Sequence, residues 1–205
     1  MKTINFFKKY SLVALLLSGC FFTSCDKDDD VPEPENELEV ITDVKLVFTN
    51  TADDTDVVEA TAQDPDGPGV EDLVIKDAIN LGTGKTYALS FEIMNNLEEP
   101  GEDIGEEIKE ENDEHQFFFG FSTDAFSDPS GNGNIDTASD DINYNDTDDN
   151  GNPVGLSTTW TTSASTLSNG EFRVVLKHQP DVKTSTSTVN DGDTDFDLKF
   201  VLNIQ

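Results

Sequence analysis

The stretch 98–121, EEPGEDIGEEIKEENDEHQFFFGF, changes its chemistry at His115. Ten carboxylates and a single lysine precede this histidine, and a phenylalanine-rich run follows it. Every second residue of the run shares a face with the histidine, which is the period-2 pattern of a β-strand that packs on a core. The residues on this face are His115, Phe117, Phe119 and Phe121. We therefore predict a strand over residues 115–121.

The acidic part of the stretch predicts a helical element. Ile104 and Ile108 lie four residues apart among acids, so a short helix or helical turn would place both against the edge of a β domain. Like charges four residues apart repel each other along a helix. A bound cation or tertiary contacts must offset that repulsion if the segment 98–114 is ordered.

Segments with alternating apolar and β-branched residues occur on both sides of this stretch, separated by turns rich in Gly, Asp and Asn. The further strands that we expect are 40–49, 57–63, 73–81, 85–95, 142–145, 156–163, 171–179 and 195–204. We expect 73–81 and 85–95 to form a hairpin around residues 82–84, and 124–141 to be a long loop. The pattern predicts an all-β fold, namely an antiparallel β-sandwich, Ig-like or jelly-roll-like, with about eight to ten short strands and one short acidic helical segment.

The N-terminus has the layout of a lipoprotein export signal. Three lysines in residues 1–10 precede an apolar run, 11–22, that is too short to span a bilayer comfortably. We expect the lipid on Cys25, which leaves the fuller apolar region upstream, with Cys20 as the alternative because the residues before it fit a bacterial lipobox. The expected parts are a signal peptide at 1–24, an acidic tether at 25–38 and a β-sandwich domain at 39–205.

Charge and cysteine content exclude several functions. The formal net charge is −31, from 12 basic and 43 acidic residues, and such a surface repels nucleic-acid phosphates. It attracts cations or basic partners, or it serves only solubility. Both cysteines fall within the first 25 residues, so we expect no intradomain disulfide, thiolate metal site or cysteine nucleophile.

The two histidines form the first candidate site. His115 begins its predicted strand and His178 ends another, so both imidazoles would meet at one rim if these strands are antiparallel neighbours. Glu111, Asp113 and Glu114 would reach the same rim. Two imidazoles with Glu111 or Glu114 suit a divalent transition metal, zinc or copper. The alternatives are a carboxylate that only orients an imidazole, or two histidines that hydrogen-bond without a metal.

A calcium loop is the second candidate site. Asp146, Asp148 and Asn150 stand at relative positions 1, 3 and 5 of a motif with Gly151 at position 6. Ser157 stands at position 12, where an EF-hand needs a bidentate glutamate, and the flanking helices are missing. Asn-Gly-Asn-Pro within this segment is strong turn chemistry, so we favour a hairpin turn and keep calcium as the alternative.

Signs of catalysis are missing from the sequence. Residues 82–86, GTGKT, look like the end of a phosphate-binding loop, but Ile79 stands where its first glycine is needed and no βαβ context surrounds it. No Gly-x-Ser-x-Gly elbow occurs either. We therefore expect that the protein is not an enzyme.

Three segments together resemble a group of small Bacteroidetes envelope lipoproteins of unknown function, often labelled "type 1 periplasmic binding fold superfamily". The segments are EDIGEEIKEENDEHQFFF (102–119), YNDTDDNGNPVGL (144–156) and LKHQPD (176–181). The resemblance runs from about residue 40 to the C-terminus, and it implies a place beside a TonB-dependent outer-membrane receptor. A type 1 periplasmic binding protein is a larger, two-lobed α/β structure. This chain has neither the length nor the helices for it, so the expected fold remains the β-sandwich.

These observations predict a lipid-anchored outer-membrane lipoprotein, exposed at the cell surface, that captures zinc or copper beside a TonB-dependent transporter. One alternative is a metal-free structural or protein-interaction module that docks a transporter through the segment 98–114. Another is a glycan-binding module that stacks a sugar on an aromatic residue such as Trp160 or Tyr144. Substituting either histidine would abolish metal binding, whereas neutralising the acids alone would abolish docking.

Overall fold

The computed structural model describes residues 39–64, 66–67, 72–97 and 99–205. The expected signal peptide (1–24), the lipidated cysteine (Cys25 or Cys20) and the tether (25–38) lie outside these residues. Within the described ranges, the structure has no helix that is long and apolar enough to cross a membrane.

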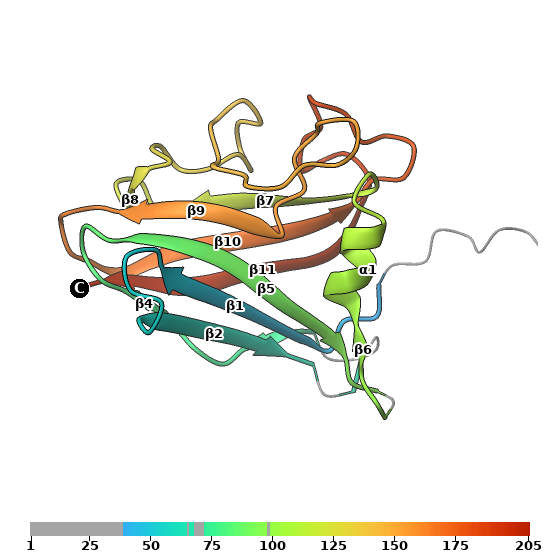
Figure 1. Ribbon diagram of the computed structural model, residues 1–205, viewed down its shortest axis with the longest axis horizontal. Coiled ribbons are helices and arrows are strands. Elements are labelled where there is room, and N and C mark those ends of the chain that lie inside the picture. The colour runs from blue at the N-terminus through green and yellow to red at the C-terminus, as the bar shows by residue number, and fades with distance from the viewer. Residues whose placement is uncertain (1–38, 65, 68–71, 98) are drawn as a thin grey trace, which may run out of the picture. The chain divides into compact units, whose positions relative to one another are not determined.

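The described residues form eleven strands and one short helix. Their bounds are β1 Asp43–Asn50, β2 Val57–Gln63, β3 Val74–Ile75, β4 Ile79–Leu81, β5 Thr86–Asn95, β6 Glu102–Asp103, α1 Ile104–Glu110, β7 His115–Phe121, β8 Phe126–Asp128, β9 Ser157–Thr162, β10 Leu167–His178 and β11 Asp193–Ile204. One sheet has the order β3-β2-β1-β5-β9-β8, with β6 beside β5, and the other has the order β4-β11-β10-β7. The pairings are antiparallel apart from β4 with β11. The all-β, sandwich-like fold that the sequence predicted is confirmed (Figure 1).

Alternating side chains from both sheets build the core. In β1 every second residue is buried, as the period-2 pattern predicted. Trp160 of β9 lies in the centre of an aromatic cluster, with ring centroids 4.9–5.5 Å from those of its neighbours. These neighbours are Phe119, Phe121, Phe126 and Phe172. Trp160 is therefore a core residue, which removes it as a surface platform for a sugar.

Strand β7 is buried along its whole length because a long loop covers its outer side. The Tyr144 hydroxyl donates to the Phe117 carbonyl at 2.6 Å and accepts from the Asn134 side chain at 2.9 Å. Burial raises the pKa of Tyr144 to about 12. The expected strand 142–145 is wrong, because its only pairing is an isolated bridge from Tyr144 to Thr158. The expected loop 124–141 contains the short strand β8.

The predicted acidic helix is present as α1, which lies across one end of the sandwich (Figure 1). The Asp103 side chain caps its N-terminus by accepting a hydrogen bond from the Glu106 backbone. Ile104 and Ile108 are both fully buried, so apolar contact with the sandwich offsets the repulsion among the acids. This packing fixes the end of α1 beside the start of β7.

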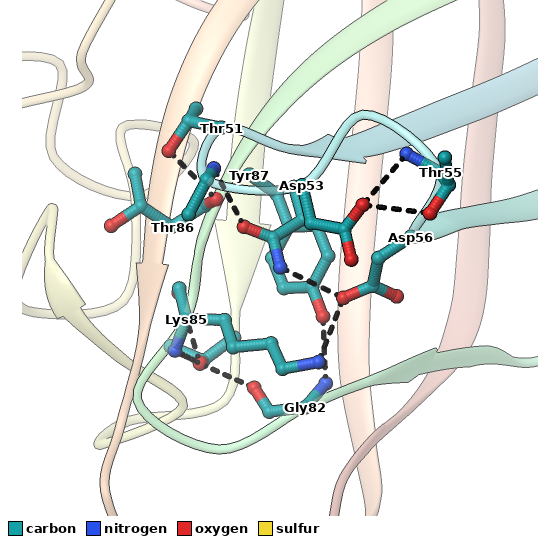
Figure 2. A network of polar contacts seen from close by, with 11 residues as sticks. Thr51, Asp53, Thr55, Asp56, Gly82, Lys85, Thr86 and Tyr87 are labelled. Atoms are coloured by element: carbon teal, nitrogen blue, oxygen red, sulfur yellow. Dashed lines mark hydrogen bonds and ion pairs between the residues drawn. The ribbon is translucent and has the colours of Figure 1, made fainter.

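The expected hairpin of 73–81 with 85–95 is wrong. β4 joins β11 in one sheet, whereas β5 lies between β1 and β9 in the other. The turn between them crosses from sheet to sheet, and its backbone donates to the Gln205 and Ser163 carbonyls, each at 3.0 Å. Figure 2 shows the polar network around this crossover, in which the Lys85 ammonium lies 2.7 Å from Asp56. The lysine of the GTGKT sequence is thus paired with a carboxylate, and the sequence forms a turn between two sheets.

Candidate metal site

The two histidines meet as a cross-strand pair. His115 is the first residue of β7, His178 is the last of β10, and the antiparallel register places them directly opposite each other. The strand adjacency on which the metal hypothesis depended is therefore confirmed. The two imidazole rings stack with centroids 4.5 Å apart and an interplanar angle of 3°. Both side chains are buried, with His115 0% and His178 4% exposed.

Each imidazole has one nitrogen held by a neighbour and one nitrogen without a partner. His115 Nδ1 lies 3.1 Å from the Glu111 carbonyl oxygen, and His178 Nε2 lies 3.3 Å from a Glu114 carboxylate oxygen. His115 Nε2 and His178 Nδ1 are buried and have no hydrogen-bond partner. Metal-binding histidines commonly use one ring nitrogen for the ion and the other for an orienting oxygen. In the same way, each of the two histidines has one ring nitrogen held by an oxygen and one that is free for an ion.

The acidic segment supplies carboxylates at the same place. Glu111 follows α1 directly, and its carboxylate, His115 and His178 offer ligand atoms that all lie within 4.8 Å of one another. Of the four predicted ligands, the structure groups these three and places Glu114 on the outer nitrogen of His178. Glu114 thus has the geometry of an orienting residue. Asp113, also expected at this rim, is outside the group.

The stacked rings are not yet in a coordinating arrangement. A ring nitrogen binds zinc along its in-plane lone pair at about 2.0–2.1 Å. Parallel stacked planes cannot direct both lone pairs at one ion, so at least one imidazole must rotate when an ion binds. His178 is better placed to turn, because its outer contact is to a side chain that is 40% exposed rather than to the backbone.

Burial shapes the protonation of the groups around the pair. It lowers the pKa of His115 to about 4, against the effect of the Glu111 carbonyl, so this ring is neutral at pH 7 and can accept a metal. Burial also raises the pKa of Asp195 to about 7 and that of Glu107 to about 7, where Glu102 and Glu39 add to the rise. Two carboxyl groups of this region therefore retain protons up to near neutral pH, whereas His115 is neutral there.

The lowered pKa of His115 predicts an acid-sensitive contribution to the stability of the metal-free protein. Unfolded histidine binds a proton near pH 6.5, whereas folded His115 does so only near pH 4. Neutral His115 therefore contributes fully to the free energy of unfolding above pH 6.5. This contribution is lost as the pH falls to about 4, and the loss is about 3 kcal/mol at most. Asp195 and Glu107 act in the opposite direction, losing stability as the pH rises from about 4 to about 7.

Comparing wild type with His115→Gln in excess chelator isolates the imidazole, because the carboxyl contributions are common to both proteins. Between pH 6.5 and 4, wild type should lose about 3 kcal/mol more of its free energy of unfolding than the variant. Urea denaturation at a series of pH values measures the difference. Parallel stability curves would contradict the lowered pKa.

The segment 146–155, which contains the predicted calcium ligands, is held together by its own hydrogen bonds. Asp148 is buried and accepts hydrogen bonds from the Asn150 and Asn152 backbones and the Asn152 side chain, at 2.8–3.1 Å. Its carboxylate also lies 3.3 Å from the buried Lys183 ammonium. Burial alone would raise the pKa of Asp148, but these hydrogen bonds and the ammonium outweigh burial and lower it.

The other two predicted calcium ligands have surroundings different from those of Asp148. Asp146 accepts a hydrogen bond from the Gly155 backbone at 2.9 Å, and Asn150 is an exposed turn residue. A calcium ion would have to displace the Lys183 ammonium. The hydrogen bonds are those of the turn that the sequence favoured.

Asp195 lies near His178 and was not among the predicted metal ligands. It stands in a row of alternating acids, Asp193, Asp195 and Asp197, whose pattern indicates an outward-facing edge. Only the strand pairing reveals that the row is interrupted at Asp195.

Comparisons of the chain with protein-family models, with curated proteins and with solved structures gave no match.

Proposed function

We propose that this protein is a lipid-anchored envelope protein that binds a divalent transition metal ion, zinc or copper, through His115, His178 and Glu111, beside a TonB-dependent transporter. The observation that carries the metal part is the cross-strand histidine pair with the Glu111 carboxylate in ligand range. Two imidazoles and a carboxylate are the ligand types that zinc and divalent copper prefer among nitrogen and oxygen donors.

Two further features support an ion at this position. The inward nitrogens of both rings are buried without partners, which is costly unless something satisfies them. The net charge of −31 also raises the local concentration of cations around the protein.

The place in the envelope is supported by the sequence alone. The export signal and Cys25 favour a lipid anchor, and the resemblance to Bacteroidetes lipoproteins favours an uptake channel as the neighbour. The protein would then hold or deliver an ion rather than transform a substrate.

A metal-free docking module is the second candidate, and the outer side of α1 favours it. Glu106 and Glu110 are exposed there, with Lys109 as the basic residue of the helix. A basic face of a transporter would find its complement on this acidic surface. In this case neutralising Glu106 and Glu110 would abolish transporter binding and leave any metal binding intact.

The test is metal content and thermal stability of the full chain, purified in detergent and dialysed against zinc or copper. Wild type should retain close to one ion per chain, and the ion should raise its melting temperature. His115→Ala and His178→Ala should both lose the ion. Glu114→Gln should bind about 10–100-fold more weakly, as expected for an orienting group.

A matched pair of variants tests the carboxylate ligand. Glu111→Gln and Glu110→Gln remove the same charge from neighbouring exposed positions, but only Glu111 lies within ligand range of the histidines. Binding should weaken in the first and stay unchanged in the second. No retained ion in wild type, together with no thermal shift in excess metal, would overturn the proposal.

A further inference from the structure

Strand β11 contains an irregularity beside the histidine pair. Leu176 pairs with Phe196 and Lys177 pairs with Thr194, so the register skips Asp195. This register skip is the pattern of a β-bulge, in which two residues of one strand oppose one residue of the other. A bulge re-aims a side chain, and it explains why Asp195 departs from the outward-facing row of Asp193 and Asp197. Both oxygens of Asp195 are shielded from solvent.

The Asp195 carboxylate lacks the partners that a buried acid normally has. Neither oxygen accepts a hydrogen bond of normal geometry. His178 is the neighbour that most favours the ionised form, and the backbone N–H of Glu39, which points at the carboxylate, favours it to a smaller extent. Burial of a carboxylate is expensive unless a cation or several donors compensate it. Six buried polar side-chain atoms lack partners in the described part of the chain. Four of these atoms belong to His115, His178 and Asp195, so most of the buried polar atoms without hydrogen-bond partners lie around the histidine pair.

We propose that Asp195 is a fourth protein ligand of the metal ion, so that two imidazoles and two carboxylates enclose it. The inference rests on the proposed metal function and specifies its coordination. Asp195 is outside the set of ligand atoms that lie within 4.8 Å of one another. However, coordination already requires a ring rotation, and Asp195 is a charged neighbour of His178. Turning His178 Nδ1 towards the bulge would bring the ion towards the Asp195 carboxylate.

This ligand set determines which ions the site can hold. Two carboxylates and a divalent cation sum to zero charge, so the filled site adds no net charge beside the two buried imidazoles. The set contains no sulfur, which disfavours monovalent copper, and it suits zinc and other divalent ions. Four protein ligands leave no open coordination position, which is typical of zinc sites that hold the ion rather than catalyse a reaction. The site would therefore sequester a divalent ion.

The test compares the metal affinity of the full chain with that of Asp195→Asn and Asp195→Ala, measured by competition with a chromophoric chelator for zinc. Asp193→Asn is the matched control, because the register places Asp193 opposite His178, yet its side chain is exposed and makes no ion pair or side-chain hydrogen bond within the described residues. The Asp195 variants should bind at least about tenfold more weakly, since even orienting groups are worth 10–100-fold. The control should bind within about twofold of wild type.

Cobalt substitution provides the second measurement. Wild type should show the intense visible absorption of four-coordinate cobalt(II), and the spectrum should change in the Asp195 variants but not in Asp193→Asn. Unchanged affinity and spectrum in the Asp195 variants, with binding still lost in His115→Ala, would overturn the role of Asp195 alone. Absence of binding in wild type would overturn the proposed function itself. Near-ultraviolet circular dichroism of the metal-free variants verifies that they are folded.

Discussion

Replacing Phe172 with alanine is expected to lower the free energy of unfolding by about 3–5 kcal/mol, the range for truncating a buried phenylalanine. Phe172 is fully buried in β10. Its ring lies 5.1–6.1 Å from four others, which come from both sheets. These are the rings of Phe48, Phe119, Phe126 and Trp160. A cavity at this position would separate the two sheets, and surrounding rings held from several strands cannot collapse to fill it.

Urea denaturation with chelator present measures the loss, and the slope against urea should stay constant because the same surface is exposed on unfolding. Glu171→Ala is the control, because Glu171 is the preceding residue of the same strand and is exposed. Its effect should stay within about 0.5 kcal/mol. If Phe172→Ala costs no more than this control, the two sheets do not share the core described above. With a typical total stability of about 5–15 kcal/mol, the expected loss is a large fraction of the whole.

The alternating pattern predicted the strands well wherever one face is buried. β2 and β7 have the predicted bounds, and β9, β10 and β11 differ from theirs by one to four residues at an end. Such strands carry their own signal, because the period of two follows from side chains that point alternately to core and solvent. Pairing carries no such local signal. The sequence of the Gly-rich turn at 82–84 suits a hairpin as well as a crossover between sheets. Only the pairing of β4 with β11, which buries Ile79 and Leu81, places β4 in the other sheet.

The residues of the candidate site also fall into those that the sequence predicts and those that only the structure shows. His115 and His178 could be found from the sequence because a strand start and a strand end meet in an antiparallel pair. Glu111 could be found because it precedes His115 by four residues. The place of Asp195 beside the histidines could not be predicted, because its inward turn depends on a bulge that leaves no local mark in an alternating row of acids. The role of Lys183 was equally hidden, since its partner Asp148 is distant in sequence.

Lys183 connects the elements that surround the histidines. Its ammonium donates to the Asn112 carbonyl, in the connection between α1 and β7, and lies 3.3 Å from Asp148 in the covering loop. The two charged side chains are 1% and 0% exposed. Burial lowers the pKa of Lys183, and the nearby Asp148 carboxylate opposes this shift. The pair thus joins the loop over β7 to the segment that carries Glu111 and Glu114.

Lys183→Met is expected to lower the free energy of unfolding by about 3–5 kcal/mol, because it leaves the buried Asp148 carboxylate without its counter-ion. Hydrogen bonds from Asn150 and Asn152 remain, which favours the lower end of this range. Urea denaturation at pH 7 measures the loss. Lys109→Met is the matched control, because the Lys109 side chain is 63% exposed and its pair with Glu106 should contribute about 0–1 kcal/mol.

The double variant Lys183→Met/Asp148→Asn separates loss of the ion pair from loss of packing. Removing both charges eliminates the uncompensated carboxylate, so the double variant should be more stable than Lys183→Met alone. Equal stabilities would mean that the lysine stem, rather than its charge, is what matters. A loss in Lys183→Met no larger than that in Lys109→Met would contradict a buried ion pair. The same reasoning predicts a functional effect: because Lys183 holds the connection after α1, its loss should weaken zinc binding although Lys183 is not itself a ligand.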